Sequence, residues 1–486
     1  MHSSSSADLD AYRLLRDGRL AEALPLAERA VADAIVCLPI HALLATILMQ
    51  QGRPNDAEDV ICRAVELKTG VAEAYDGLAY VSMALGRHER ASLLYRRASG
   101  LAPQTARFWY NLASCERGLG RLSEAEAACD RAIAVDAKQY PSYLLRSQLR
   151  VQTPDLNHVT ELQGQLARLA DDNRAQMFLG YALAKELDDL ERFDEAFEWF
   201  AKAAQTRRSR LAYDVAVDEQ KMQRIAETFP RISVGTTRDA SDTSKYIFIV
   251  GLPRSGTTLL ERVLTGLPGV FSNGETDNFS RALMDATPAG QDDVFVRAAA
   301  ADPGVVGANY AVRANTSKSH DKIVEKLPMN YLYLGAIRQS LPEAKILLVR
   351  RAPLDSCFAM FRTLFGEAYP FSYDFNDLAR YFAAYDTLMN HWRTVLGDGF
   401  SEVVYEDLVR EPARVGAEVA KYCGLAWSSE AIEIQKNKSV SLTASAAQVR
   451  RPIYGTSSGR WRHYHRHLQP LIAALRKKRV SLPDDA

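Results

Sequence analysis

The sequence predicts an α-solenoid of helical repeats over residues 8–229, a linker at 230–244 and an α/β domain with a parallel sheet over residues 245–486. Two observations carry this prediction. A motif recurs every 34 residues in the first half, and in the second half an apolar, β-branched run is followed by a glycine-bearing loop and a helix. At 486 residues the chain is also too long for a single ordinary hydrophobic core.

A Gly-Arg pair marks the repeat. The four pairs begin at Gly18, Gly52, Gly86 and Gly120, and each is 34 residues from the next. An alanine follows five residues after each glycine and another after seven more; these are Ala23, Ala30, Ala57, Ala64, Ala91, Ala98, Ala125 and Ala132. Small residues let two helices pack closely, and glycine can end the first helix in the left-handed conformation. The pattern resembles tetratricopeptide (TPR) repeats, which stack into a superhelix.

The repeat register weakens after the fourth Gly-Arg pair. We expect residues 149–185 to form a degenerate helical pair and residues 190–197 to resume the pattern with a shift of three residues. Residues 211–229 are expected to form a capping helix. The Gly-, Thr- and Ser-containing stretch 230–244 has little periodicity and is therefore assigned as the linker.

The stretch Tyr246–Leu264 organises the second half of the chain. Its first residues form an apolar run that predicts a buried strand, and its last residues have helical spacing. Between them, loop N–H groups and the helix N-terminus can surround an anion, to which Arg254 adds a forked donor. The P-loop of ATPases and GTPases needs a lysine after its second glycine, but Gly256 is followed by Thr257. A nucleoside triphosphate site is therefore the weaker interpretation.

The loop sequence Pro-Arg-Ser-Gly-Thr-Thr after a strand resembles the 5′-phosphosulfate loop of sulfotransferases. These enzymes take a sulfuryl group from 3′-phosphoadenosine 5′-phosphosulfate (PAPS) and release 3′-phosphoadenosine 5′-phosphate (PAP). The resemblance implies a donor-binding loop made of Arg254, Ser255, Gly256, Thr257 and Thr258. It also implies that Arg254 stabilises charge in catalysis.

Two catalytic residues are assigned through the same resemblance. The pair Gly274-Glu275 resembles tyrosylprotein sulfotransferases and bacterial TPR-linked sulfotransferases, in which the glutamate is the general base for the acceptor hydroxyl. Lys326, followed by Leu and Pro328, resembles the family lysine that neutralises the bridging oxygen of the leaving group. Without the resemblance, either residue could be an ordinary solvated charge.

The run before Arg350 and Arg351 predicts a second buried strand, and the two arginines resemble the 3′-phosphate motif of the family. We assign Arg351 to that motif, because Asp355 then has the family spacing. The serine expected eight residues after this arginine is Ala359, which puts the usual Arg/Ser pair in doubt. Ser356 is the alternative partner, and a pair of surface charges is the alternative role of the arginines.

Two later segments complete the predicted donor site. Residues 403–408 predict a third strand with its exit, and the resemblance places Tyr405 near the adenine, although it could equally be a buried strand residue. Residues 442–462 resemble the nucleotide-closing run of the family over nearly their whole length. This match implies that Ser445 lies near the transferring sulfuryl group, and that Gly459 and Arg460 lie near the 3′-phosphate.

Composition limits the remaining interpretations. Lys+Arg and Asp+Glu both total 60, and a net charge of zero argues against bulk binding to nucleic acid or membrane surfaces. The six cysteines are scattered, with no Cys/His cluster that suggests a metal. The N-terminal residues lack the pattern of a signal peptide, and no apolar run approaches about 20 residues. We therefore expect a cytoplasmic protein without a membrane span.

These resemblances imply a PAPS-dependent sulfotransferase that transfers a sulfuryl group in line to an acceptor hydroxyl. The acceptor would be protein or peptide tyrosine, or alternatively a small molecule, sugar or lipid. An NTPase or kinase with an altered loop, and a TPR scaffold with an inactive nucleotide-binding domain, are the interpretations from other classes. The repeats would bind the acceptor protein, brace the enzyme or form a homodimer interface, because no groove residue distinguishes these roles.

Overall fold

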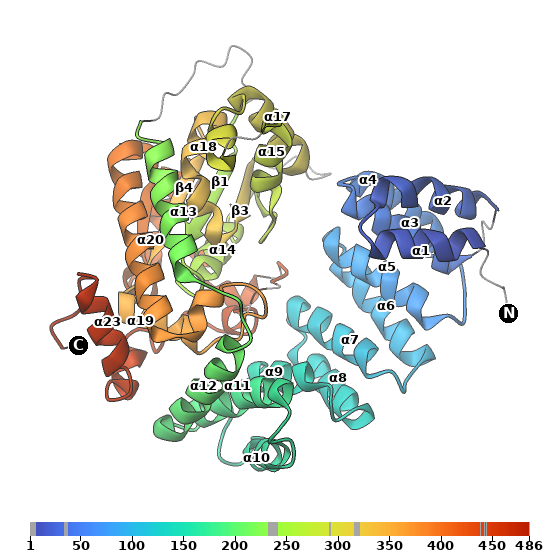
Figure 1. Cartoon of the computed structure of the whole chain (residues 1–486), viewed down its shortest axis with the longest axis horizontal. Helices are drawn as coiled ribbons and strands as arrows, with labels where there is room; N and C mark the ends of the chain where they lie inside the picture. Colours follow the sequence, from blue (N-terminus) through green and yellow to red (C-terminus); the bar gives the residue numbers. More distant parts are fainter. Residues whose placement is uncertain are drawn as a thin grey trace. The chain divides into compact units, whose positions relative to one another are not determined.

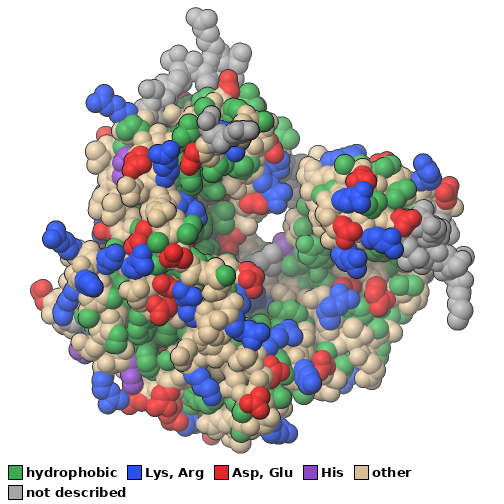
Figure 2. Space-filling view, in the orientation of Figure 1, with side chains coloured by type: hydrophobic (Ala, Val, Ile, Leu, Met, Phe, Trp, Pro, Cys, Tyr) green, Lys and Arg blue, Asp and Glu red, His purple; other side chains and the backbone are tan. Residues whose placement is uncertain are grey.

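The structure is a computed structural model that describes residues 6–33, 37–231, 242–290, 293–314, 321–437, 439–441, 443 and 445–485. The chain divides into two compact units. Unit 1 contains residues up to Gln152 together with a short stretch at 440–442, and unit 2 contains the remainder. Figure 2 shows cationic and anionic side chains interspersed on the visible surface, as expected for a chain with no net charge.

Unit 1 is a series of helix pairs (Figure 1). Its helices are α1 (Ser6–Arg16), α2 (Leu20–Asp33), α3 (Leu38–Gln50), α4 (Pro54–Ala64), α5 (Ala72–Ala84), α6 (His88–Leu101), α7 (Ala106–Leu119), α8 (Leu122–Val135) and α9 (Tyr140–Gln148). The glycines of the four Gly-Arg pairs have φ between 71° and 82°, the left-handed region that glycine tolerates best. All eight repeat alanines are buried between helices. The predicted helical-repeat architecture is confirmed.

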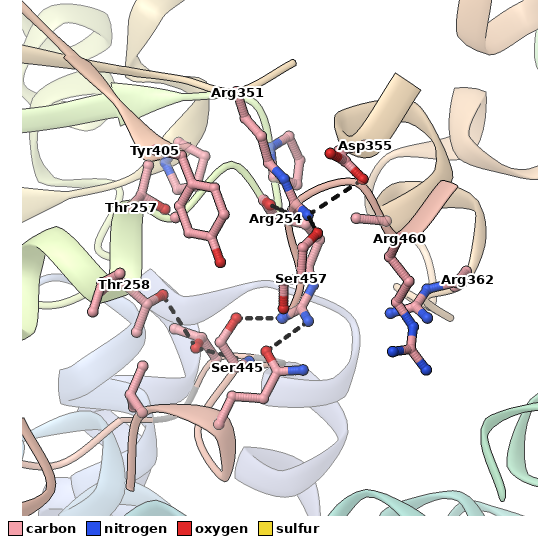
Figure 3. Close-up of a pocket in the computed structure, with 18 of the residues that line it drawn as sticks. Arg254, Thr257, Thr258, Arg351, Asp355, Arg362, Tyr405, Ser445, Ser457 and Arg460 are labelled. Carbon is pink, nitrogen blue, oxygen red and sulfur yellow. Dashed lines mark hydrogen bonds and ion pairs between the residues drawn. The ribbon is translucent and has the colours of Figure 1, made fainter. Parts of the chain in front are cut away.

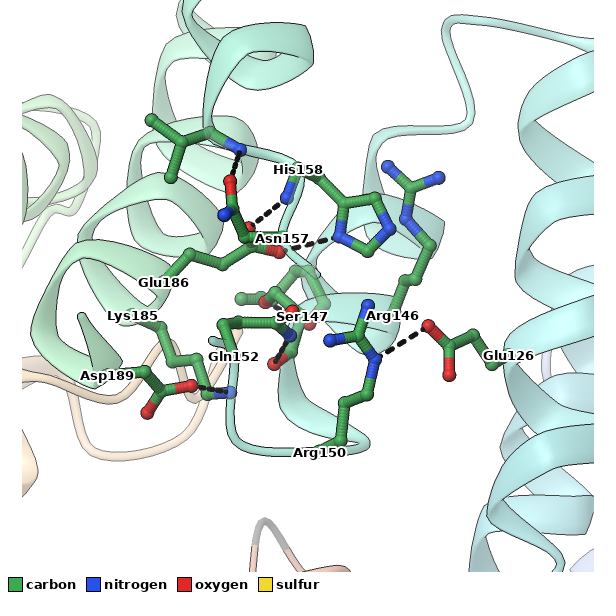
Figure 4. Close-up of polar contacts among 12 residues, drawn as sticks. Glu126, Arg146, Ser147, Arg150, Gln152, Asn157, His158, Lys185, Glu186 and Asp189 are labelled. Carbon is green, nitrogen blue, oxygen red and sulfur yellow. Dashed lines mark hydrogen bonds and ion pairs between the residues drawn. The ribbon is translucent and has the colours of Figure 1, made fainter. Parts of the chain in front are cut away.

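Ion pairs join successive helix pairs of unit 1. Arg87, the arginine of the third Gly-Arg pair, reaches back to Glu58 at 3.1 Å. Arg121, the arginine of the fourth, reaches Glu89 at 2.5 Å. The arginine that follows the repeat glycine therefore links neighbouring repeats in the second half of the array. A further pair, between Arg150 and Glu126 at 3.0 Å, links α8 to the residues after α9 (Figure 4).

Unit 2 contains a five-stranded sheet and the helices around it. Its strands are β1 (Tyr246–Gly251), β2 (Val270–Ser272), β3 (Lys322–Lys326), β4 (Lys345–Arg350) and β5 (Ser401–Val404). The helices before the sheet are α10 (Val159–Arg168), α11 (Asn173–Asp189), α12 (Phe193–Arg208) and α13 (Val215–Thr228). The others are α14 (Thr257–Thr265), α15 (Asn278–Ala286), α16 (Val294–Ala299), α17 (Pro303–Ala314), α18 (Leu334–Ser340), α19 (Pro353–Phe361), α20 (Phe375–Leu396), α21 (Tyr405–Arg410), α22 (Pro412–Tyr422) and α23 (Gln469–Lys477).

The sheet is parallel, with the strand order β2-β3-β1-β4-β5. Successive side chains of β1, the central strand, point to opposite faces of the sheet. Helices cover both faces and bury these side chains. Ile247 and Ile249 join the core formed with α14 and α22. On the opposite face, the ring of Phe248 lies 5.9 Å from Phe279 of α15 and 5.4 Å from Tyr310 of α17. The predicted α/β domain with a parallel sheet is thus confirmed.

The third predicted strand is shorter than expected. β5 ends at Val404, and Tyr405 begins α21 instead of continuing the strand. Parallel strands end at the same edge of a sheet, so Tyr405 comes to lie at the edge where the loop after β1 also emerges. Even the longest described helix, α20, carries charges along its length, and no helix in the described part of the chain could cross a bilayer.

Helices α10–α13, which the sequence assigns to the repeat region, group with the sheet in unit 2. The Tyr181 hydroxyl of α11 donates to the Phe361 carbonyl at 3.1 Å, and Arg208 of α12 pairs with Asp377 at 2.7 Å. His158, which precedes α10, contacts Glu186 of α11 at 2.9 Å (Figure 4). The module boundary at 230–244 stays a prediction, and residues 232–241 lie outside the described residues.

These contacts predict how the chain can be shortened. A protein that starts at Thr153 should fold cooperatively, whereas one that starts at Lys245 should not, because it lacks the helices that contact α19 and α20. Circular dichroism during thermal denaturation would compare the two. The same sharp unfolding transition in both proteins would contradict this prediction.

Candidate active site

A pocket lies at the carboxyl edge of β1 and β4 (Figure 3). The chain leaves β1 through a tight turn in which Arg254 has a φ of 65° and Gly256 a φ of 107°. A side chain at residue 256 would place its Cβ 2.4 Å from the ring of Tyr405. Glycine is therefore required here both for its backbone conformation and for the close approach of the tyrosine.

Arg254 projects into the pocket toward the segment that carries Ser445 (Figure 3). One guanidinium nitrogen donates to the Ser445 hydroxyl, and another donates to the Gln448 side chain at 2.8 Å. Burial, together with the positive charge of Arg362, lowers the pKa of Arg254 to about 10. Its Nε and the hydroxyl of Ser255 are buried and have no hydrogen-bond partner among the described residues.

Arg351, the first residue after β4, also lines the pocket. Its guanidinium donates to the backbone carbonyls of Arg254, at 2.9 Å, and Ser457, and it lies 4.7 Å from the ring centre of Tyr405. Its Nε is likewise buried without a partner in the described structure. The neighbouring Arg350 instead pairs with Glu402 at 2.8 Å and is not among the lining residues.

Asp188 at the end of α11 holds two further arginines of the pocket. Arg362 lies 2.7 Å and Arg460 2.8 Å from its carboxylate, which also accepts a hydrogen bond from the Tyr464 hydroxyl. Although burial acts to raise it, the charges of the two arginines hold the pKa of Asp188 below its usual value. Figure 3 shows Arg362 and Arg460 side by side. No motif in the sequence pointed to Asp188, because it lies in a helix assigned to the repeats.

Asp355 fixes the segment that closes over the pocket. Its carboxylate accepts a hydrogen bond from the Gly459 N–H at 2.7 Å, so this segment is tied to α19. Ala359, one turn further along α19, lines the pocket without a hydroxyl group. Ser356, the alternative partner, is buried and donates to the Arg351 carbonyl at 3.2 Å.

Glu275 and Lys326, two of the predicted catalytic residues outside the loop, contact each other directly. Lys326 is completely buried, and its ammonium group also lies 3.7 Å from Glu261 of α14. Glu275 is partly exposed and lines the pocket. Two carboxylates thus compensate the buried ammonium, and one of them faces the space where a substrate would lie.

Aromatic residues form the wall beside Glu275. Phe365 and Tyr369 line the pocket, with ring centres 4.8 Å apart in an edge-to-face arrangement. Tyr369 has a φ of 54°, which is unusual for a tyrosine and indicates local backbone strain. Burial, and to a lesser extent the charge of Glu275, raises the pKa of Tyr369. No motif in the sequence pointed to this pair.

The structure brings most of the predicted site residues together. Those that line the pocket are Arg254, Gly256, Thr257, Thr258, Glu275, Arg351, Tyr405, Ser445 and Arg460. Ser255 is buried in the loop between two lining residues, Lys326 contacts Glu275, and Gly459 donates to Asp355. Leu442 and Ala444 of the closing run lie outside the described residues. In the part of the chain that the structure describes, no group of three or more His, Cys, Asp or Glu residues could hold a metal ion.

Comparison with known families agrees with the two halves of the structure. Residues 246–429 match the model described as the sulfotransferase family, and residues 10–74 and 77–143 match the tetratricopeptide repeat. The chain is thus a TPR protein that carries a domain of the sulfotransferase family.

Individual proteins resemble the chain more distantly. An uncharacterized protein of Aquifex aeolicus (strain VF5) is 27% identical over 439 residues, which cover 86% of this chain but 57% of that protein. The sulfotransferase domain of the Synechococcus PCC 7002 olefin synthase is 20% identical, covers 52% of this chain and 100% of its own, and has a TM-score of 0.36. The sulfotransferase domain of the curacin biosynthetic pathway is 17% identical, covers 49% of this chain and 98% of its own, and has a TM-score of 0.33.

The position of Asp188 predicts its contribution to stability. Asp188→Ala should lower the free energy of unfolding by about 3–5 kcal/mol, because it leaves two partly buried arginines without their counter-ion. Urea denaturation would measure the change. Asp194→Ala is the matched control, since Asp194 also contacts two basic side chains, Arg466 and His467, but is 66% exposed, and it should leave the unfolding midpoint almost unchanged. Equal effects of the two substitutions would contradict this account.

Proposed function

We propose that this protein is a PAPS-dependent sulfotransferase. The observation that carries the proposal is the set of four arginines that line one pocket of the described structure: Arg254, Arg351, Arg362 and Arg460. Two of them have a buried Nε without a partner in the described residues, and Arg254 has a lowered pKa. A pocket with this charge and these free donors fits a ligand with more than one anionic group. The family match favours a sulfuryl donor among such ligands.

The residues of the pocket suit the separate parts of PAPS. Arg254, Thr257, Thr258 and the loop N–H groups would hold the 5′-phosphosulfate at the N-terminus of α14. A second group, made of Arg351 and Arg460, would hold the 3′-phosphate and so distinguish PAPS from ATP. The ring of Tyr405 offers a flat surface for the adenine. When bound, PAPS supplies the sulfuryl group and a stable phosphate leaving group.

On the acceptor side, Glu275 would take the proton. Its carboxylate faces the pocket and would accept the proton of the acceptor hydroxyl at an Oε atom. Lys326 keeps a positive charge beside this carboxylate, and Glu261 gives the ammonium group a second contact. The ammonium group of Lys326 would stabilise the negative charge that develops on the leaving group. Ser445, bound to Arg254, would help to position the transferring group.

The wall beside Glu275 favours an aryl hydroxyl as the acceptor. Phe365 and Tyr369 can pack against an aromatic ring whose hydroxyl points to Glu275. Tyrosine of a protein or peptide has this chemistry, and TPR repeats commonly bind peptides. We therefore propose a tyrosine-containing protein as the acceptor. An aliphatic hydroxyl of a sugar or lipid would make less use of this wall.

Calorimetric titration with PAP, and with ADP as the control ligand, tests the donor assignment. PAP should bind at least about tenfold more tightly than ADP, because ADP has no 3′-phosphate. Arg351→Ala should weaken PAP binding by about 10- to 100-fold through the loss of charge-assisted hydrogen bonds. Arg350→Ala, the neighbouring arginine outside the pocket, should bind PAP like the wild type. Equal binding of ADP would indicate an NTPase, and binding of neither ligand would indicate a scaffold.

The acceptor assignment predicts a different behaviour for Glu275→Gln. This variant should bind PAP normally and should lose at least about 100-fold in sulfuryl transfer, because the amide cannot take the acceptor proton. Labelled PAPS with a tyrosine-rich peptide pool, followed by mass spectrometry of the products, would measure transfer and its site. Transfer to serine or to sugar hydroxyls would reject the aryl acceptor and keep the donor assignment.

A further inference from the structure

Glu325, the glutamate of β3, lies buried behind the loop that carries Glu275. Successive side chains of a strand point to opposite faces, so Glu325 and Lys326 face different sides of the sheet. The Glu325 carboxylate accepts hydrogen bonds from Thr276 at 3.0 Å and from Tyr310 and Asn278 at 3.3 Å. The Asn273 amide is a fourth donor at 3.4 Å.

Three of these four donors flank Glu275 in the sequence. Asn273 precedes it, and Thr276 and Asn278 follow it. Hydrogen bonds to one buried carboxylate therefore hold the segment 272–278. Backbone hydrogen bonds join the same segment to β3, with the Asn273 N–H donating to the Val324 carbonyl at 2.9 Å. Side chain and backbone thus fix the position from which Glu275 contacts Lys326.

The donors around Glu325 match its ionised form. A carboxylate accepts at both oxygens, whereas a protonated carboxyl group must donate one hydrogen and loses part of its accepting capacity. Burial opposes ionisation and raises the pKa of Glu325 to about 7, although the four hydrogen bonds act in the opposite direction. Of the groups that face it, Tyr310 from α17 titrates, with a pKa that burial raises further, while Asn273, Thr276 and Asn278 do not.

We propose that Glu325 is a positioning residue, which in its ionised form clamps the segment 272–278 and so fixes Glu275 against Lys326. The inference rests on the proposed role of Glu275 as the proton acceptor. Protonation of Glu325 weakens the clamp, since fewer donors can then be satisfied. The segment therefore becomes better ordered as the pH rises through neutrality.

Hydrogen exchange of the whole chain, followed by mass spectrometry, tests the clamp. In Glu325→Gln, amide exchange in the segment 272–278 should rise about tenfold or more, while the affinity for PAP should stay within about twofold of the wild type. In the wild type, exchange corrected for its intrinsic pH dependence should fall as the pH rises through about 7, and this step should be absent in Glu325→Gln. Unchanged exchange in the variant, or no such step in the wild type, would overturn the proposal.

Two controls separate the clamp from general stability and from the proposed function. Asn278→Ala removes one donor but keeps the carboxylate, so it should cause a smaller rise in exchange and should keep the pH step. If Glu325→Gln does not fold, the double variant Thr276→Val/Asn278→Ala replaces it and must raise exchange in the segment for the proposal to stand. Failure of the wild type to bind PAP would reject the donor assignment, whereas the exchange of segment 272–278 reports on Glu325 alone.

Discussion

Positive charge gathered at one edge of a parallel sheet is the constraint around which unit 2 is built. Burial first, and then the like charges of neighbouring arginines, disfavours a buried guanidinium cation, and together they lower the pKa of Arg254. The fold offsets this cost in different ways at each arginine. Asp188 compensates Arg362 and Arg460, whereas backbone carbonyls accept from Arg351. The Nε atoms of Arg254 and Arg351 are buried and have no hydrogen-bond partner among the described residues. A bound anion could therefore accept hydrogen bonds from them.

The opposite side of the pocket has the complementary arrangement. There the carboxylates of Glu261 and Glu275 surround the ammonium of Lys326, which is fully buried. The pocket therefore has an arginine-rich end and an end where a carboxylate faces the space. An anionic donor and a hydroxyl acceptor would be drawn to different ends, which is the arrangement that in-line transfer needs. Glu325 lies on the reverse face of β3 and holds this second end in place.

Local patterns in the sequence predicted the parts of the structure that local physics determines. The repeat glycines adopt left-handed conformations and the repeat alanines are buried, because both properties depend on a period of one helix pair. The loop after β1 was predictable because the strand, the loop and the helix lie in one continuous stretch of sequence. Asp188 and the aromatic pair Phe365 and Tyr369 were not, since each acquires its neighbours only when distant segments pack together. Helices α10–α13 are assigned to the repeats by their local sequence patterns, whereas their grouping with the sheet depends on contacts between distant segments.

The place of Asp188 along the chain has a consequence for biosynthesis. A ribosome makes α11 before the sheet, so this aspartate has left the exit tunnel long before Arg362 and Arg460 are polymerised. Each arginine can therefore find its counter-ion as soon as it emerges. Had the aspartate followed them, the nascent sheet would hold several cations at one edge with nothing to compensate them. The order of the residues thus makes the counter-ion available before either arginine is added to the chain.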